Sequence, residues 1–80
     1  MNNLSNNMNS NSILTYSARL CAVIEEEIQK ASLQNPSAEQ VYALICNAYV
    51  ERGEEIFDSD NPADVMVHAF VMLDVEENRS

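Results

Sequence analysis

The 80-residue chain is poor in the residues that build loops and chemical sites: it contains one Gly, two Pro, two Cys, one His and no Trp. A single Gly leaves little material for the glycine-rich loops that cradle phosphates, and neither GxSxG nor HExxH occurs. Two Cys without a CxxC spacing are too few for a four-ligand zinc site. We therefore expect a protein that is not an enzyme and that uses no metal and no cofactor.

Positive charge is also scarce, with four Lys and Arg against 13 Asp and Glu and a formal net charge of −9. Repulsion from phosphates makes direct binding to nucleic acid or to anionic membranes unfavourable. No apolar run approaches the roughly 18 residues of a membrane span, and the amino terminus has neither the basic start nor the apolar core of a secretion signal. The sequence therefore predicts a cytoplasmic protein that binds no nucleic acid and no membrane.

The chain does contain enough apolar material for one small core. Hydrophobic residues make up 46% of it, and a chain of this size buries only about 60–65% of the surface that its unfolded form exposes. Residues 1–11 are rich in Asn and Ser and lack charge and apolar periodicity, so we expect a disordered tail. We predict a single all-α domain over residues 12–80, a small three-helix bundle with helices at about 12–33, 38–52 and 62–75.

Cap residues mark the beginning of each predicted helix. The first should begin near Ser12, a good cap residue. The second begins with Ser37 and Gln40, which fit a capping box. The third begins with Asn61 as the cap and Pro62 at the first helical position, where the missing amide is harmless. Three- and four-residue spacing gives the first helix one stripe for the core: Ile13, Ser17, Leu20, Cys21, Ile24, Ile28 and Ala31.

Two further pairs of residues are expected to serve the core. Cys21 and Cys46 both fall on apolar faces of predicted helices, so we interpret them as reduced thiols that act as small hydrophobes. A disulfide that joins the first two helices is the alternative. Ile56 and Phe57 follow the end of the second helix, and we expect them to fold back against the core.

Residues 61–75 are the most apolar part of the chain. Apolar side chains alternate along this segment as a strand would require, and others fill the opposite side. A lone strand has no partner within the chain, so the helix-start signals favour a helix. The alternative is a strand that pairs with its copy across a dimer axis. A helix that is apolar all round must be covered on more than one face. We therefore expect a helical homodimer whose self-association residues are Val65, Met66, Ala69, Phe70, Met72 and Leu73.

Two local patterns are interpreted as structural. Residues 58–69 begin like a calcium loop, but Ala63 stands where the loop needs Gly and Ala69 where it needs Glu, which excludes an EF-hand. His68 has no catalytic companions in the sequence, so we expect a partly buried structural histidine. A pH-sensitive interface is the alternative for His68.

Acidic residues gather between the second and third predicted helices. Complementary charge selects partners and speeds their association. We expect a surface centred on residues 51–64, with help from residues 25–27, that consists of Glu51, Glu54, Glu55, Asp58, Asp60, Asp64, Glu25 and Glu26. An ordinary solubilising surface is the simpler interpretation of the same residues.

The favoured function is that of a small regulatory or inhibitory protein that docks this acidic surface onto the basic surface of another protein. A nucleic-acid-binding protein is one such partner, which would make the chain a nucleic-acid mimic. In size the chain also resembles small bacterial regulators and phage-encoded inhibitors. The alternative is a helical chaperone or assembly subunit that binds an amphipathic segment of a partner through the apolar surface of residues 65–73.

Overall fold

The computed structural model describes residues 15–79, and its side chains as far as residue 78. The elements in this part are α2 (Ala18–Ala31), α3 (Ala38–Arg52), the short 3-10 helix η1 (Gly53–Ile56) and α4 (Pro62–Arg79). All the elements of this part are helices and it contains no strand, so the all-α prediction is confirmed, as is the helical interpretation of the last segment. The predicted tail and the predicted start at Ser12 fall on residues outside the described part.

The start of α2 differs from the prediction. Residues 15–17 are not helical, and Ser17 is the N-cap, with an extended backbone and a side-chain oxygen that accepts a hydrogen bond of 3.1 Å from the amide of Leu20. Ser17 therefore lies outside the helix, because a cap residue precedes the helix it begins, but it is buried as predicted, whereas Cys21 and Ala31 of the predicted stripe are exposed. At the other end Ser32 adopts a left-handed conformation with φ 56°, which stops the helix before the predicted Leu33.

The starts of α3 and α4 are as predicted. Ser37 and Gln40 form a reciprocal capping box: the Ser37 side chain accepts from the Gln40 amide at 3.1 Å, and the Gln40 side chain accepts from the Ser37 amide at 2.8 Å. The Asn61 side chain caps α4 by accepting from the amide of Asp64 at 3.1 Å. Helix α4 continues to Arg79, four residues beyond the prediction.

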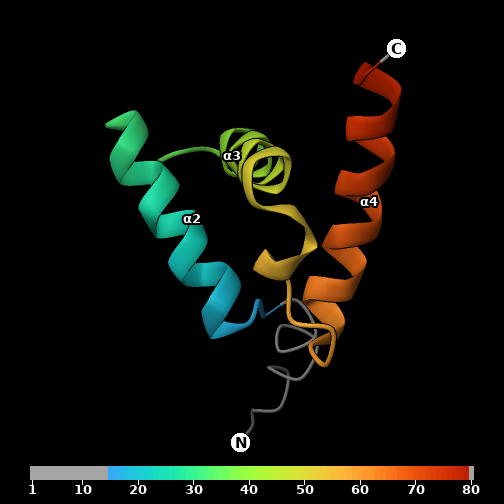
Figure 1. Ribbon diagram of the computed structural model, residues 1–80. Helices are drawn as coiled ribbons and strands as arrows, with labels where there is room; N and C mark the ends of the chain where they lie inside the picture. The colour runs from blue at the N-terminus through green and yellow to red at the C-terminus, as the bar shows by residue number, and fades with distance from the viewer. Residues whose placement is uncertain (1–14, 80) are drawn as a thin grey trace, which may run out of the picture.

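Helix α3 crosses between α2 and α4, which spread apart from a common lower end (Figure 1). Helices α2 and α4 pack against α3, and α2 also packs against η1. Ile56 and Phe57 are 4% and 6% exposed, so the predicted return of this pair to the core is confirmed. The core is contributed by all these elements and consists of Leu20, Val23, Ile45, Ala48, Ile56, Phe57, Val67 and Val71.

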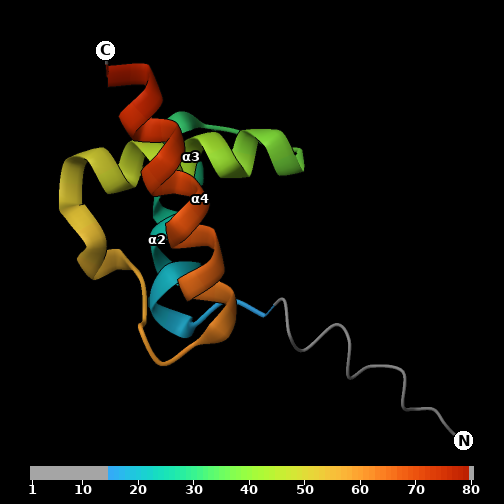
Figure 2. The same ribbon diagram turned by 90° about the vertical axis from the view of Figure 1, so that its right-hand side faces the viewer.

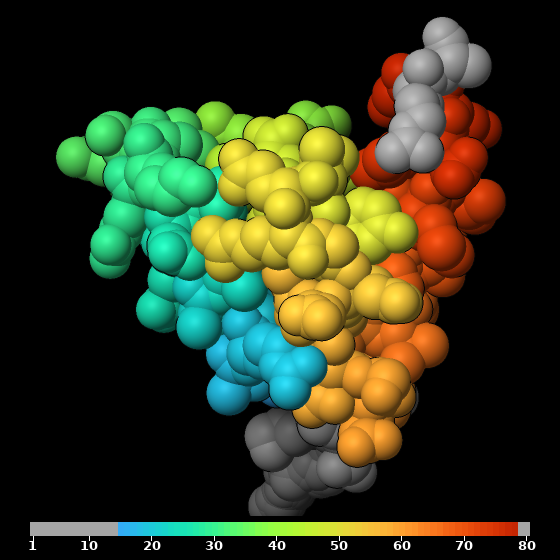
Figure 3. Space-filling view, viewed as in Figure 1, coloured from blue at the N-terminus to red at the C-terminus, as the bar shows by residue number. Residues whose placement is uncertain are grey.

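A buried carboxylate joins the lower ends of α2 and α4. Asp64 has no exposed surface. Its oxygens accept hydrogen bonds from the Ser17 amide at 2.9 Å, the Ser17 hydroxyl at 2.5 Å and the Asp58 amide at 2.7 Å. A buried charge is tolerated only when donors surround it in this way. The N-cap of α2, the loop before α4 and the first turn of α4 are therefore held together by one side chain, at the junction visible in Figure 3.

The orientation of α4 about its own axis is unusual. Three of its polar residues, Asp64, His68 and Asp74, are buried or half-buried, while of the apolar residues between them only Val67 and Val71 are buried. The ring of His68 stacks on that of Phe57, with centroids 4.6 Å apart and an interplanar angle of 19°. Figure 2 shows α4 in front of α2 and α3, with its outer side uncovered by either helix.

Replacing Asp64 should therefore weaken the whole fold. We expect Asp64→Ala to lower the free energy of unfolding by about 3 kcal/mol, because it leaves the donors on Ser17 and Asp58 without their acceptor. Asp60→Ala is the matched control, since its side chain is exposed in the same loop, and should stay within about 0.5 kcal/mol of the wild type. Urea denaturation followed by circular dichroism measures both, and equal midpoints for the two variants would contradict the role given to Asp64.

Candidate interaction surface

Apolar side chains form a continuous exposed surface along the first three turns of α4. The apolar face, as we name it, consists of the residues predicted for self-association: Val65, Met66, Ala69, Phe70, Met72 and Leu73. All of them are exposed, and Phe70 and Leu73 keep 59% and 62% of their surface accessible. At 100° per residue these positions span about 160° of the helix. The rest of the described chain thus covers α4 on its inner side alone.

An aromatic hollow lies along one edge of the apolar face. Tyr16 from the segment before α2 and Tyr42 from α3 line it together with Met66 and Phe70, and its volume is about 320 Å³. The Tyr42 hydroxyl donates a hydrogen bond of 2.8 Å to the carboxylate of Asp74. Burial and this hydrogen bond raise the pKa of Tyr42 well above its ordinary value, so the hydroxyl stays protonated and the ring is held at the hollow.

Acidic residues lie along the other edge. Glu54 and Asp58 line a second hollow, of about 230 Å³, together with Val65 and His68. The His68 Nε2 atom is buried and has no hydrogen-bond partner in the part of the chain that the structure describes. The two edges of the apolar face therefore differ in chemistry, one aromatic and the other negatively charged.

Several of the acids predicted for partner binding are engaged within the chain. Arg52 contacts Glu26 at 2.8 Å and the buried Glu27 at 3.1 Å, and Lys30 contacts Glu27 at 3.3 Å and Glu51 at 3.7 Å. The hydrogen bond to Glu27, with the charges of Glu27 and Glu51, raises the pKa of Lys30 above its ordinary value. This cluster joins α2 to α3 and offsets part of the negative charge there.

Asp64 does not lie on the predicted acidic surface. It is fully buried, because its carboxylate is needed as the acceptor that joins α2 to α4. Within residues 15–78, no ion pair involves the remaining acids of the segment before α4, which are Glu54, Glu55, Asp58 and Asp60. Three of these four are exposed and Asp58 is half-buried. Glu25, which was also predicted for this surface, is exposed on α2. The available acidic surface is therefore smaller than predicted and borders the apolar face.

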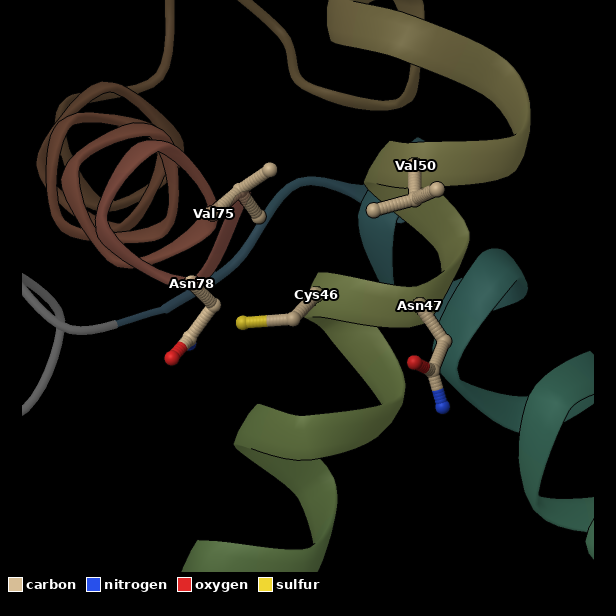
Figure 4. A pocket seen from close by; sticks show the side chains of 5 residues that line it. All are labelled: Cys46, Asn47, Val50, Val75 and Asn78. Carbon is tan, nitrogen blue, oxygen red and sulfur yellow. The ribbon is translucent and has the colours of Figure 1, made fainter. Parts of the chain in front are cut away.

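The two cysteines are free, and they occupy different environments. Cys21 is exposed, so its predicted place in the core was wrong, and Cys46 is half-buried on α3. Figure 4 shows the Cys46 thiol pointing from α3 toward Asn78 and Val75 of α4, in a third hollow of about 340 Å³. Burial raises the pKa of Cys46 above its ordinary value, which makes it a poor nucleophile.

Sequence reasoning missed the residues that border the apolar face from other helices. Tyr16 and Tyr42 are 26 positions apart in the chain, and no spacing rule places two such residues beside Phe70. Ser17 could have been found, since a Ser directly after an aromatic residue and three positions before Leu20 fits an N-cap as well as Ser12 does. The pairing of Arg52 with Glu27 depends on how α2 and α3 cross, which local sequence does not determine.

Residues 15–79 contain no group of three or more side chains suited to hold a metal ion. Nor is any helix among them both long and apolar enough to cross a membrane. The chain matches no known protein family, no curated protein and no solved structure.

The Tyr42–Asp74 contact predicts a dependence of stability on pH. The pKa of Tyr42 is higher in the folded than in the unfolded chain, so its contribution is complete below the ordinary pKa of about 10 and falls as the pH rises above it. We expect Tyr42→Phe to cost about 1 kcal/mol at pH 7, and the difference from the wild type to narrow between pH 9 and pH 11. Thermal unfolding over this range measures it, and a difference that widens with pH would contradict the assignment.

Proposed function

We propose that this protein works without catalysis, as a small binding protein that uses the apolar face of α4 to hold an amphipathic segment of a partner. One observation carries the proposal: six neighbouring apolar side chains of α4 are exposed, while Asp64 of the same helix is buried and His68 and Asp74 are half-buried. Helices recognise amphipathic partners through apolar anchors at this spacing. Contiguous exposed apolar surface is uncommon on soluble monomers outside interaction sites.

Energetics favour the apolar face over the acidic loop as the main source of affinity. Burying apolar surface contributes about 25 cal/mol per Å², and this contribution is scarcely screened by salt. Exposed ion pairs contribute between about 0 and 1 kcal/mol each and weaken as ionic strength rises. Met66 and Met72 add flexible side chains that adapt to differently shaped partners.

A second candidate function remains the docking of the acidic loop onto a basic surface of a partner, for example a nucleic-acid-binding protein. It is supported by Glu54, Glu55 and Asp60, which are exposed and lack an ion pair within the described part of the chain. The two candidates differ in the surface that touches the partner. A residue-specific cross-linker can therefore separate them.

We expect a photoreactive benzoylphenylalanine in place of Phe70 to cross-link the chain to a discrete partner in the cells that produce it. The substitution keeps an aromatic ring at an exposed position, so the fold should be unchanged. Matched probes replace Glu55 in η1 and Ala22 on the exposed side of α2. Gel electrophoresis and mass spectrometry of the adducts measure the result, and the probe at position 22 should give no adduct.

The pattern of adducts decides between the candidates. An adduct from position 70 that disappears on adding Leu73→Ser supports the apolar face. Adducts from position 55 alone would support the acidic loop and contradict the proposal.

A further inference from the structure

We infer that the occupant of the apolar face is a helix from a different protein, amphipathic and with Lys or Arg along one edge, rather than a second copy of this chain. This inference rests on the proposed function and specifies the chemistry of the partner. It is carried by the unequal edges of the apolar face and by the charge of the chain. Both constrain what can lie against α4.

The acidic edge of the apolar face is negative at both ends. At the start of α4, Glu54 and Asp58 share a hollow with Val65. Near the other end Glu76 is exposed and follows Met72 by four positions, so it continues the same side of the helix one turn further on. At 1.5 Å per residue, Val65 and Glu76 are about 16 Å apart along the axis. A helix laid along this edge meets carboxylates at both ends of the apolar contact.

The aromatic edge offers a place for an anchor side chain. Tyr16, Tyr42, Met66 and Phe70 bound a hollow of about 320 Å³ with a predominantly apolar lining. That volume is at the lower end of the range for small-ligand pockets, and it suits one or two large side chains such as Leu or Phe. The opposite edges therefore favour a partner helix with apolar residues on one side and basic residues on the other.

A second copy of the chain fits this surface poorly. Each copy has a net charge of −9, so pairing brings two strongly negative molecules together. In an antiparallel twofold pair of α4 helices the acidic edges face each other. In a parallel pair the acidic edge of each copy faces the aromatic edge of the other, where no basic side chain of this face offsets the repulsion between the two net charges. Neither arrangement brings opposite charges together, whereas a basic helix is attracted to the acidic edge in either direction.

Synthetic helical peptides test the partner chemistry directly. The probes are three 18-residue peptides with the same Leu stripe, whose flanking positions carry Lys, Gln or Glu. We expect the Lys peptide to bind the full chain at least tenfold more tightly than the Gln peptide, and the Glu peptide more weakly still, by fluorescence anisotropy in 100 mM NaCl. Raising the salt to 500 mM should reduce the advantage of the Lys peptide over the Gln peptide to less than threefold.

Variants locate the binding surface. Phe70→Ser should weaken binding of the Lys peptide at least tenfold, and Glu54→Gln should weaken it about threefold. Glu25→Gln removes the same charge from an exposed position on α2 and should have no effect. Equal binding by the Lys and Gln peptides, equal effects of Glu54→Gln and Glu25→Gln, or binding unaffected by Phe70→Ser would each overturn the inference.

The oligomeric state supplies an independent test. We expect sedimentation equilibrium to show a monomer at micromolar concentration. A dimer that Phe70→Ser dissociates would assign the apolar face to a second copy and overturn the inference. The cross-linking experiment in cells separates failure of this inference from failure of the proposed function. An adduct from position 70 to another protein supports the proposed function whatever charge that protein carries.

Discussion

The buried carboxylate of Asp64 is the constraint on which the rest of the structure depends. It accepts hydrogen bonds from the amide and hydroxyl of Ser17 and from the amide of Asp58. The donors belong to the N-cap of α2 and to the loop before α4, so the carboxylate fixes which side of α4 faces these segments. Val67 and Val71 then follow Asp64 into the interior. The residues on the other side of the helix have no core left to enter.

With α4 in this orientation, apolar side chains that could enlarge the small core stay exposed. A chain of this length has little core to spare, yet Phe70 and Leu73 remain more than half exposed. Other contacts offset the loss: the capping box of α3, the ion pairs between α2 and α3, and the return of Ile56 and Phe57 to the core. Stability therefore comes from the inner side of each helix, and the outer side of α4 stays exposed.

The sequence predicted the elements better than their mutual arrangement. The capping signals at Ser37 and Asn61 predicted the starts of α3 and α4 because a cap acts within four residues of itself. The many apolar residues of α4 predicted that part of its surface contacts another molecule. Their spacing did not show which side of the helix faces the core, because apolar residues occur on nearly all sides. Asp64 was expected among the surface acids because a carboxylate at the start of a helix is usually solvated. Its burial depends on Ser17, 47 positions earlier, and local sequence carries no signal for such a pair.

The unfolding free energy of two α4 variants at low protein concentration tests most directly the claim that α4 turns an apolar face away from its own core. Leu73 is 62% exposed and Val71 is fully buried, two residues apart on the same helix. The account predicts that Leu73→Lys changes the free energy of unfolding by less than about 0.5 kcal/mol, while Val71→Ala lowers it by about 2 kcal/mol. A loss from Leu73→Lys as large as that from Val71→Ala would contradict it, since Leu73 would then belong to the core of the single chain.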